Sequence, residues 1–92
     1  MNMKTIHWDK SSSGIKASLT FENQTKLAEF VLQLARLSDE IQHHADMEIR
    51  YNRLGLNIIT HDAKAVTEKD EALCREIEKL LIELNRTSWN VR

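Results

Sequence analysis

The hydrophobic positions near the start of the chain follow a period of two residues. Ile6 and Trp8 alternate with polar residues over Lys4 to Asp9. After the turn-forming residues 11–14, the alternation resumes at four positions, which are Ile15, Ala17, Leu19 and Phe21. A period of two is typical of strands with one apolar face. We therefore predict two strands joined by a tight Ser-Gly turn, that is, a β-hairpin.

From Asn23 onward the period lengthens to that of a helix. The stripe recurs at steps of three and four residues and consists of Leu27, Phe30, Val31, Leu34, Ala35, Ser38 and Ile41. This spacing predicts an amphipathic helix that runs to about Gln42, with Asn23 as its N-cap. Asp39 lies on the flank of the stripe and His43 lies one turn beyond it. We expect both to point from the helix end toward one rim.

Two further strands are predicted after the helix. Met47, Ile49 and Tyr51 alternate on odd positions, whereas a second apolar set, made of Leu54, Leu56 and Ile58, alternates on even positions. The phase slips at residues 52–53, which indicates a tight turn or a bulge. We favour a hairpin because asparagine tolerates the left-handed conformation that short turns demand.

A second helix is predicted near the end of the sequence. Residues 67–70 read as a capping box in which Asp70 replaces the usual glutamate. The apolar stripe that follows ends near Asn85 and consists of Leu73, Cys74, Ile77, Leu80, Leu81 and Leu84. The tail from Thr87 to Arg92 holds Trp89 and could either dangle or pack.

These elements predict an α+β fold with the order strand, strand, helix, strand, strand, helix. Two antiparallel hairpins make a four-stranded sheet, and two amphipathic helices can cover only one of its faces. The other face must be polar or used for association. Residues 1–92 are enough for a single domain, and a domain this small is expected to oligomerise.

Composition narrows the function classes. Thirteen basic and fourteen acidic residues give a formal charge of -1, which offers no electrostatic footprint for nucleic acid or an anionic membrane. The longest apolar run, around Leu80 to Ile82, is too short to span a bilayer, and the first ten residues lack a signal-peptide core. The single Cys74 cannot form an internal disulfide, so we expect a cytoplasmic protein with a buried, inert thiol.

Three of the four histidines gather in residues 39–70, as the pair His43-His44 and as His61. Imidazoles around one cavity can both give and take protons near neutral pH. A zinc site with Asp39 or Asp62 is the other possibility, but adjacent histidines rarely ligate one ion, so we expect no metal. His7 is expected at the surface, and Trp8 in packing rather than in ligand contact.

The spacing of these residues resembles the pterin-4a-carbinolamine dehydratases, also called 4a-hydroxytetrahydrobiopterin dehydratases. The pattern is an acidic residue, a His-His pair, an aromatic residue, a histidine and an aspartate, and here it consists of Asp39, His43, His44, Tyr51, His61 and Asp70. Family members pair their sheets edge to edge and pack helices into tetramers, which implies a homodimer or homotetramer. They usually carry a further helix before the first strand, and because only seven residues precede Trp8 here, we expect this helix to be missing.

The resemblance implies loss of water from a 4a-hydroxytetrahydropterin, giving quinonoid dihydropterin during recycling of a tetrahydrobiopterin-type cofactor. His43, His44 and His61 would be the catalytic residues, with no metal and no bound cofactor. Asp39 would raise the basicity of a neighbouring histidine or accept a hydrogen bond from the pterin. Main-chain groups of Gln42, His43 and His44, and of Ile59, Thr60, His61 and Asp62, would hold the ring. Tyr51 and Asp70 would support the pocket, Asp70 by capping its helix.

Three positions depart from the family pattern. Ala45 replaces the usual proline after the histidine pair, Lys64-Ala65 replaces a connection that commonly contains glycine, and Asp39 replaces the usual glutamate. Ala45, the Lys64-Ala65 connection and the missing first helix would suit the alternative function, a non-catalytic binding or assembly factor, such as a dimerisation partner of a transcription factor or a chaperone for a carboxylase. The complete histidine set favours catalysis.

Overall fold

The computed structural model describes residues 6–86. Its element order confirms the predicted one: β1 (Asp9–Ser11), β2 (Gly14–Thr20), α1 (Gln24–Ile41), β3 (Asp46–Arg50), β4 (Arg53–Ile58) and α2 (Glu68–Arg86). Lys4 and Thr5 of the predicted first strand and the tail with Trp89 lie outside the described residues. No helix in the described range is long and apolar enough to cross a membrane.

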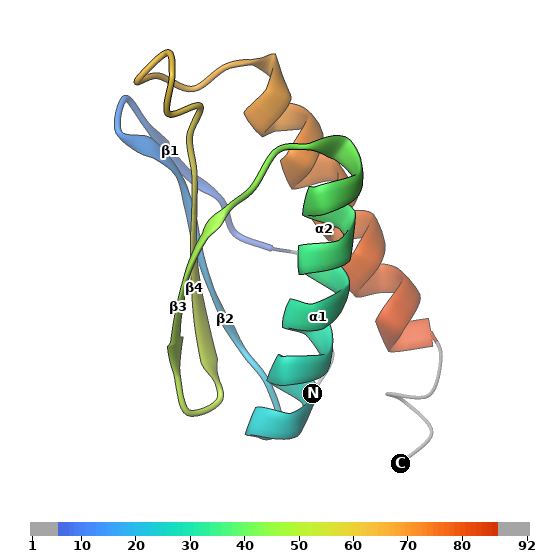
Figure 1. The fold of residues 1–92 in the computed structure, drawn as a ribbon. Coiled ribbons are helices and arrows are strands. Elements are labelled where there is room, and N and C mark those ends of the chain that lie inside the picture. The colour runs from blue at the N-terminus through green and yellow to red at the C-terminus, as the bar shows by residue number, and fades with distance from the viewer. Residues whose placement is uncertain (1–5, 87–92) are drawn as a thin grey trace.

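The four strands form one antiparallel sheet in the order β1-β2-β4-β3, and both helices pack on one of its faces (Figure 1). Ile15 pairs with Ile58 and Leu19 with Leu54, so the two central strands turn matching apolar rows toward the helices. The core between sheet and helices is centred on fully buried side chains, which include Ile15, Leu27, Phe30, Leu34, Leu54, Ile58, Leu73, Ile77 and Leu81. The alternation read from the sequence is therefore the alternation of buried and open faces.

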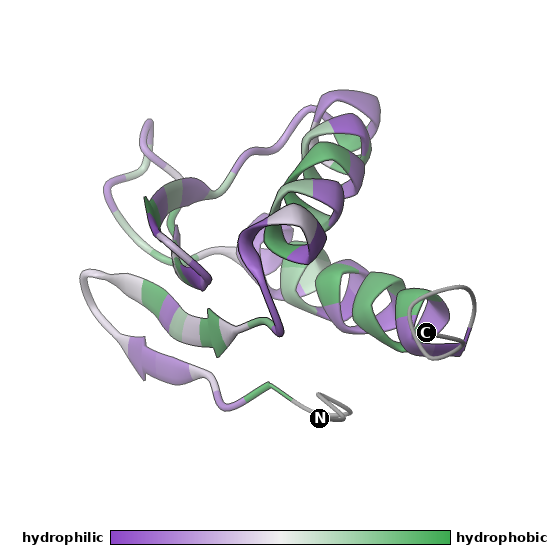
Figure 2. Ribbon diagram, turned by 90° about the horizontal axis from the view of Figure 1, so that it is seen from below, coloured by the Kyte–Doolittle hydropathy of each residue, from purple (hydrophilic) through white to green (hydrophobic). Residues whose placement is uncertain are grey.

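No helix covers the opposite face of the sheet (Figure 2), and the strand residues that alternate with the buried ones are polar or glycine. Its rows follow from the strand register, in which Lys16 faces Asn57, and Asn57 in turn faces Asp46. Gly55, at the centre of the sheet, lies between Ser18 and Glu48. The expectation of a polar second face is confirmed.

The first strand lies later in the sequence than predicted. Lys4 to Asp9 was the expected range, but pairing occupies Asp9–Ser11 because a two-residue turn closes Ser11 directly against Gly14. Gly14 has φ +139°, and a Cβ there would lie 2.1 Å from Oδ1 of Asn57, so the turn requires glycine. Ile6 still packs in the core, and the Trp8 ring packs against it while Nε1 donates to Oε2 of Glu78 at 2.8 Å.

The predicted N-cap of α1 forms, and the helix also ends in a C-cap that the sequence did not predict. Oδ1 of Asn23 accepts from the backbone N–H of Lys26 at 2.9 Å. At the other end of α1, Gln42 adopts a left-handed conformation with φ 57°, and the N–H of His43 donates to the carbonyl of Ser38 at 3.1 Å. This left-handed residue turns the chain off the helix axis, so the histidine pair leaves α1 toward the sheet.

The β3–β4 hairpin forms, but with a different left-handed residue from the one expected. Tyr51 has φ 51°, while Asn52 uses its side chain to donate from Nδ2 to the carbonyl of Phe21 at 2.8 Å. The backbone N–H of Phe21 donates to the carbonyl of Asn52 at the same distance, 2.8 Å. Asn52 therefore fastens the hairpin turn to the end of β2, which the local sequence could not reveal.

Candidate functional site

His43 is held by a buried carboxylate from the other helix. Nε2 of His43 lies 2.6 Å from Oδ1 of Asp70, whose side chain has no exposed surface. The His43 side chain is only 13% exposed. The left-handed turn at Gln42 and the first turn of α2 together bring these two groups into contact, although they are 27 residues apart.

Asp70 connects three segments of the chain. Its Oδ2 accepts from the hydroxyl of Thr60 at 2.8 Å and from the backbone N–H of Thr67 at 2.7 Å, the second bond completing the predicted capping box. Burial raises the pKa of Asp70, but the bonds from His43, Thr67 and Thr60 outweigh it and hold the pKa below 3.8. An ionised carboxylate only accepts hydrogen bonds, so Nε2 of His43 carries a proton.

The other two histidines are paired in a looser way. Nε2 of His44 lies 2.8 Å from Oδ1 of Asp39 on the last turns of α1, and Nε2 of His61 lies 3.3 Å from Oδ2 of Asp46. The side chains of His44 and His61 are 61% and 69% exposed. Exposed ion pairs of this kind contribute little to stability, so both imidazoles can rotate.

A small closed loop carries His61. Thr60 and Ala65 exchange backbone hydrogen bonds, with Thr60 N–H donating at 3.1 Å and Ala65 N–H donating at 3.4 Å. Between them the N–H of Lys64 donates to the carbonyl of His61 at 3.1 Å, and Lys64 adopts φ 52°. Lys64 therefore completes the loop in a left-handed conformation that glycine adopts more easily than lysine.

Ala45, which stands where the family usually has proline, lies in the core. Ala45 is 8% exposed and packs with the apolar cluster between sheet and helices. The residue that follows the histidine pair therefore contributes burial, and its small side chain fits where the chain enters β3.

The predicted site residues fall into two groups. The chain turns at Gln42, His43 and His44, and again at Thr60, His61 and Asp62, at the same end of the sheet (Figure 1). Ile59, just beyond β4, leads into the second of these segments. Tyr51 lies at the opposite end of the sheet, in the β3–β4 turn, and 66% of the residue is exposed to solvent. Within one chain, Tyr51 does not join the histidines.

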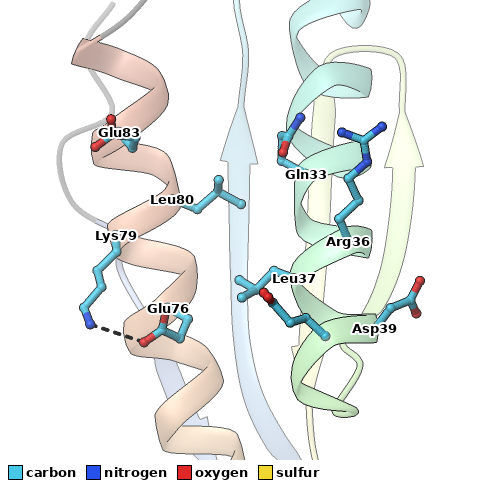
Figure 3. A pocket seen from close by; sticks show the side chains of 9 residues that line it. Gln33, Arg36, Leu37, Asp39, Glu76, Lys79, Leu80 and Glu83 are labelled. Atoms are coloured by element: carbon cyan, nitrogen blue, oxygen red, sulfur yellow. Dashed lines mark hydrogen bonds and ion pairs between the residues drawn. The ribbon is translucent and has the colours of Figure 1, made fainter.

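The histidine end of a single chain is an open surface. His43 reaches toward the helices, whereas His61 meets Asp46, which borders the polar face of the sheet. Three surface hollows of residues 6–86 lie between the helices, between α1 and β3, and over Gly55, and no histidine lines any of them. In the first, Leu37 and Leu80 point toward each other across the gap between the helices, while Asp39 points away from α2 (Figure 3).

Metal and nucleophile chemistry find no support in the described residues. In that part of the chain, no three histidine, cysteine or carboxylate side chains gather in a way that could hold a metal ion. Cys74 is buried, and burial followed by the nearby Glu71 carboxylate raises the pKa of its thiol to about 11. A thiol that stays protonated at neutral pH is a poor nucleophile.

The sequence did not reveal three of the residues that hold the imidazoles in place. Asp46 has no place in the sequence prediction, and Thr67 appears there only as part of a helix cap. The side-chain hydroxyl of Thr60, as opposed to its main chain, was not considered at all. A signal for Asp46 existed, since it follows the histidine pair by two residues, but its contact with His61 depends on the β3–β4 register.

Comparison with known proteins gives a consistent result. The family model described as "Pterin 4 alpha carbinolamine dehydratase" matches residues 2–80. A protein of Thermomicrobium roseum named "Putative pterin-4-alpha-carbinolamine dehydratase" is 37% identical over 73 residues, which cover 79% of this chain and 78% of that protein. A protein of Sulfolobus acidocaldarius with the same name is 36% identical over 73 residues, covering 79% and 80%.

Two solved structures share the fold. One, titled as a transcriptional coactivator/pterin dehydratase from Brucella melitensis, has a TM-score of 0.75 and 26% identity, covering 80% of this chain and 81% of that one. The other, titled as a pterin dehydratase-like protein that is a RuBisCO assembly factor in the alpha-carboxysome, has a TM-score of 0.67. The match covers 84% of this chain and 89% of that chain. At 14% identity it supports the fold alone.

Proposed function

Since the chain belongs to the pterin-4a-carbinolamine dehydratase family, we propose that it removes water from 4a-hydroxytetrahydropterins by histidine acid/base catalysis. The product is quinonoid dihydropterin, and the role in the cell is recycling of a tetrahydrobiopterin-type cofactor in the cytoplasm. The observation that carries the proposal is that His43, His44 and His61 each turn Nε2 toward a separate carboxylate at one end of the sheet.

This common orientation has a chemical consequence. A carboxylate that accepts from Nε2–H leaves Nδ1 of the same ring available to a substrate, as an acceptor when the ring is neutral and as a donor when it is charged. Three such rings at one end of the sheet offer both a proton donor and a proton acceptor. His43 is the positioned member, because its partner Asp70 is fixed by Thr60 and Thr67.

The reaction needs two proton transfers and nothing else. One imidazolium gives a proton to the 4a-hydroxyl, the C4a–O bond breaks, and water leaves with the bonding electrons. One neutral imidazole removes the proton from N5, and those electrons form the C4a=N5 double bond. The enzyme ends with the same total number of protons as it began with, so no metal, redox cofactor or covalent intermediate is required.

The pterin ring would lie at the rim formed by the two turning segments. Main-chain groups of residues 42–44 and 59–62 surround this rim, and Asp39 lies at its α1 side. Backbone donors and acceptors suit a pterin, because its pyrimidine edge carries both kinds of group. We propose that the main chain of Gln42, Ile59 and Asp62 binds the substrate in this way. The carboxylate of Asp39, paired with His44, supports that imidazole or accepts a hydrogen bond from the pterin.

The direct test is an assay with chemically generated 4a-hydroxytetrahydropterin in which the appearance of the quinonoid product is followed spectroscopically. Single changes His43→Ala, His44→Ala and His61→Ala should each lower kcat/KM by roughly 10²–10⁴ where the ring acts as acid or base. His7→Ala is the matched control, because His7 lies outside the site and should leave the rate unchanged. A wild-type protein no faster than buffer would refute the proposal.

The second candidate function is binding or assembly without catalysis. The observation that favours it is the openness of the histidine end, where His44 and His61 are largely exposed. A protein of this kind would show no acceleration in the same assay and no rate change in any histidine variant. The two functions therefore separate in one experiment.

A further inference from the structure

Gly55 lies in a central strand at a position where the chain itself does not require glycine. Its φ is not positive, and a Cβ there would lie 3.8 Å from the Cβ of Glu48, which is an ordinary contact. Strand β4 pairs with both neighbours in an unbroken register, so the glycine does not serve a bulge. Glycine weakens a strand interior and often marks a place where a ligand approaches the backbone closely. What the missing side chain provides here is space.

That space is a hollow of about 330 Å³ over Gly55, at the small end of the range for ligand pockets. The strand register sets Lys16, Asn57 and Asp46 in one row across the sheet, and Glu48 beside Gly55 in the next row. All four polar residues line the hollow. By the alternation of side chains along a strand, they lie on the face of the sheet that no helix covers.

The hollow adjoins the candidate site. Asp46 lines the hollow, and its Oδ2 lies 3.3 Å from Nε2 of His61. Asn57, at the same end of the hollow, precedes the turning segment 59–62 by two residues. A ring held at the rim of residues 42–44 and 59–62 therefore has the hollow beside it, and a substituent on that ring can extend over Gly55.

The polar groups around the hollow suit hydroxyl groups. No ion pair in residues 6–86 includes Lys16, so its ammonium group can donate to a ligand. Oδ1 of Asn57 is covered and has no hydrogen-bond partner in that range, which leaves Nδ2 as a second donor. The carboxylates of Asp46 and Glu48 accept. A hydroxyl group both donates and accepts, so it can bond with either kind of group.

Other kinds of substituent fit less well. An anionic group would meet two carboxylates and one ammonium, and an apolar group would leave the polar side chains without partners. The arginines of the next row, Arg50 and Arg53, do not line the hollow. Arg50 is also paired with Glu48 at 3.5 Å. A long acidic tail would therefore have to pass both carboxylates before it reached a second cation.

We propose that the hollow over Gly55 binds the substituent at C6 of the pterin and selects neutral, hydroxylated substituents. This inference rests on the proposed dehydratase function for the position of the ring, and it adds the substrate class. The ring would be held by the main chain at the rim, whereas the substituent would be held by side chains of the sheet face.

Calorimetric titration with three 7,8-dihydropterins measures this selection. 7,8-Dihydrobiopterin carries a dihydroxypropyl group, 6-methyl-7,8-dihydropterin carries only a methyl group, and 7,8-dihydrofolate carries an acidic tail. Wild-type protein should bind the first about tenfold more tightly than either of the others, the usual effect of one or two added hydrogen bonds. Equal affinities for the first two, or tighter binding of dihydrofolate, would overturn the proposal.

Variants locate the selection in the hollow. Gly55→Val fills it with a side chain that suits a strand, and should reduce the preference for dihydrobiopterin to about twofold or less while affinity for the 6-methyl compound is unchanged. Lys16→Met removes one donor, keeps most of the side chain and should reduce the preference about threefold. Thr20→Val, on the same face of β2 but outside the hollow, is the matched control. A full preference in either hollow variant would refute the assignment.

The hollow and the proposed function can fail separately. Dehydration of 4a-hydroxy-6-methyltetrahydropterin involves no hydroxylated substituent, so wild-type protein that does not accelerate it refutes the function. Acceleration of this substrate, together with a KM for the dihydroxypropyl substrate that Gly55→Val leaves unchanged, refutes the hollow alone. The expected result is acceleration of both substrates and a KM that rises about tenfold in Gly55→Val for the dihydroxypropyl substrate only.

Discussion

The imidazole of His43 and the carboxylate of Asp70 meet with 2.6 Å between Nε2 and Oδ1, and the carboxylate is completely buried. This contact joins the end of α1 to the start of α2. Thr60 donates to the same carboxylate, so the end of β4 is joined as well. One aspartate therefore fixes both the fold at this end and the imidazole that the proposed chemistry uses.

Replacing Asp70 with asparagine should cost about 1.5–3 kcal/mol of unfolding free energy, the usual worth of hydrogen bonds to a charged group. The amide keeps the size of the side chain but turns one of its accepting atoms into a donor, which cannot satisfy Thr60, Thr67 and His43 together. Urea unfolding at neutral pH measures the change. Glu68→Gln, an exposed change two residues earlier in the same helix, should stay within about 0.5 kcal/mol. Equal effects of the two changes would contradict the central role of Asp70.

The stability supplied by Asp70 should depend on pH. Burial raises its pKa, but hydrogen bonds from His43, Thr67 and Thr60 outweigh burial, so the folded pKa lies below the unfolded value of 3.8. The contribution is therefore fully present above that value and is lost as the pH falls through the folded pKa. Urea unfolding of wild-type protein and Asp70→Asn should give a large difference at neutral pH that shrinks below pH 3.8. A difference that grows on acidification would show the opposite sign.

Lys64→Gly should stabilise the protein by roughly 1 kcal/mol or less, because φ 52° is strained for lysine and natural for glycine. Thermal unfolding should show a raised Tm. The matched control is Lys79→Gly, an exposed change in the middle of α2, which should cost about 1 kcal/mol. Destabilisation by both changes would mean that the lysine side chain at position 64 has a structural role of its own.

The thiol of Cys74 should react slowly in the native protein. It is buried and its pKa is raised to about 11, so little thiolate exists at pH 8. A chromogenic disulfide reagent should label it at once in urea and at least tenfold more slowly without urea. Cys74→Ala should leave the dehydration rate within twofold of wild type. Rapid native labelling together with loss of activity would assign the thiol a place in the chemistry.

The local parts of the fold could be predicted from the sequence. Asn23 and Asp70 mark helix starts with side chains that satisfy nearby N–H groups, and the alternation in β2 and β4 sets their buried face. The first strand was predicted too early in the sequence because Ile6 and Trp8 alternate with polar residues, as strand residues do. Both pack against the core, but they precede strand β1. The register that puts Asp9 against Lys16 is decided by the Gly14 turn instead.

The site could be predicted in its parts but not in its contacts. The spacing of the histidines identified the candidate catalytic residues, because the family pattern can be read directly from the sequence. Their partners were hidden, because His43–Asp70 and His61–Asp46 cross 27 and 15 residues of chain and depend on helix packing and strand register. The pattern groups Tyr51 with the histidines, but the β3–β4 turn holds it at the opposite end of the sheet, which depends on strand pairing rather than on spacing in the sequence.

The central claim is that His43, His44 and His61 serve one ligand, and imidazole NMR measures this most directly. A stable, unreactive dihydropterin is titrated into labelled protein while the ring signals of all four histidines are recorded. The account predicts that the signals of His43, His44 and His61 move together with one Kd. The signal of His7, which precedes the edge strand β1, should stay in place. Movement of only one histidine of the three, or of none at saturating ligand, would contradict it.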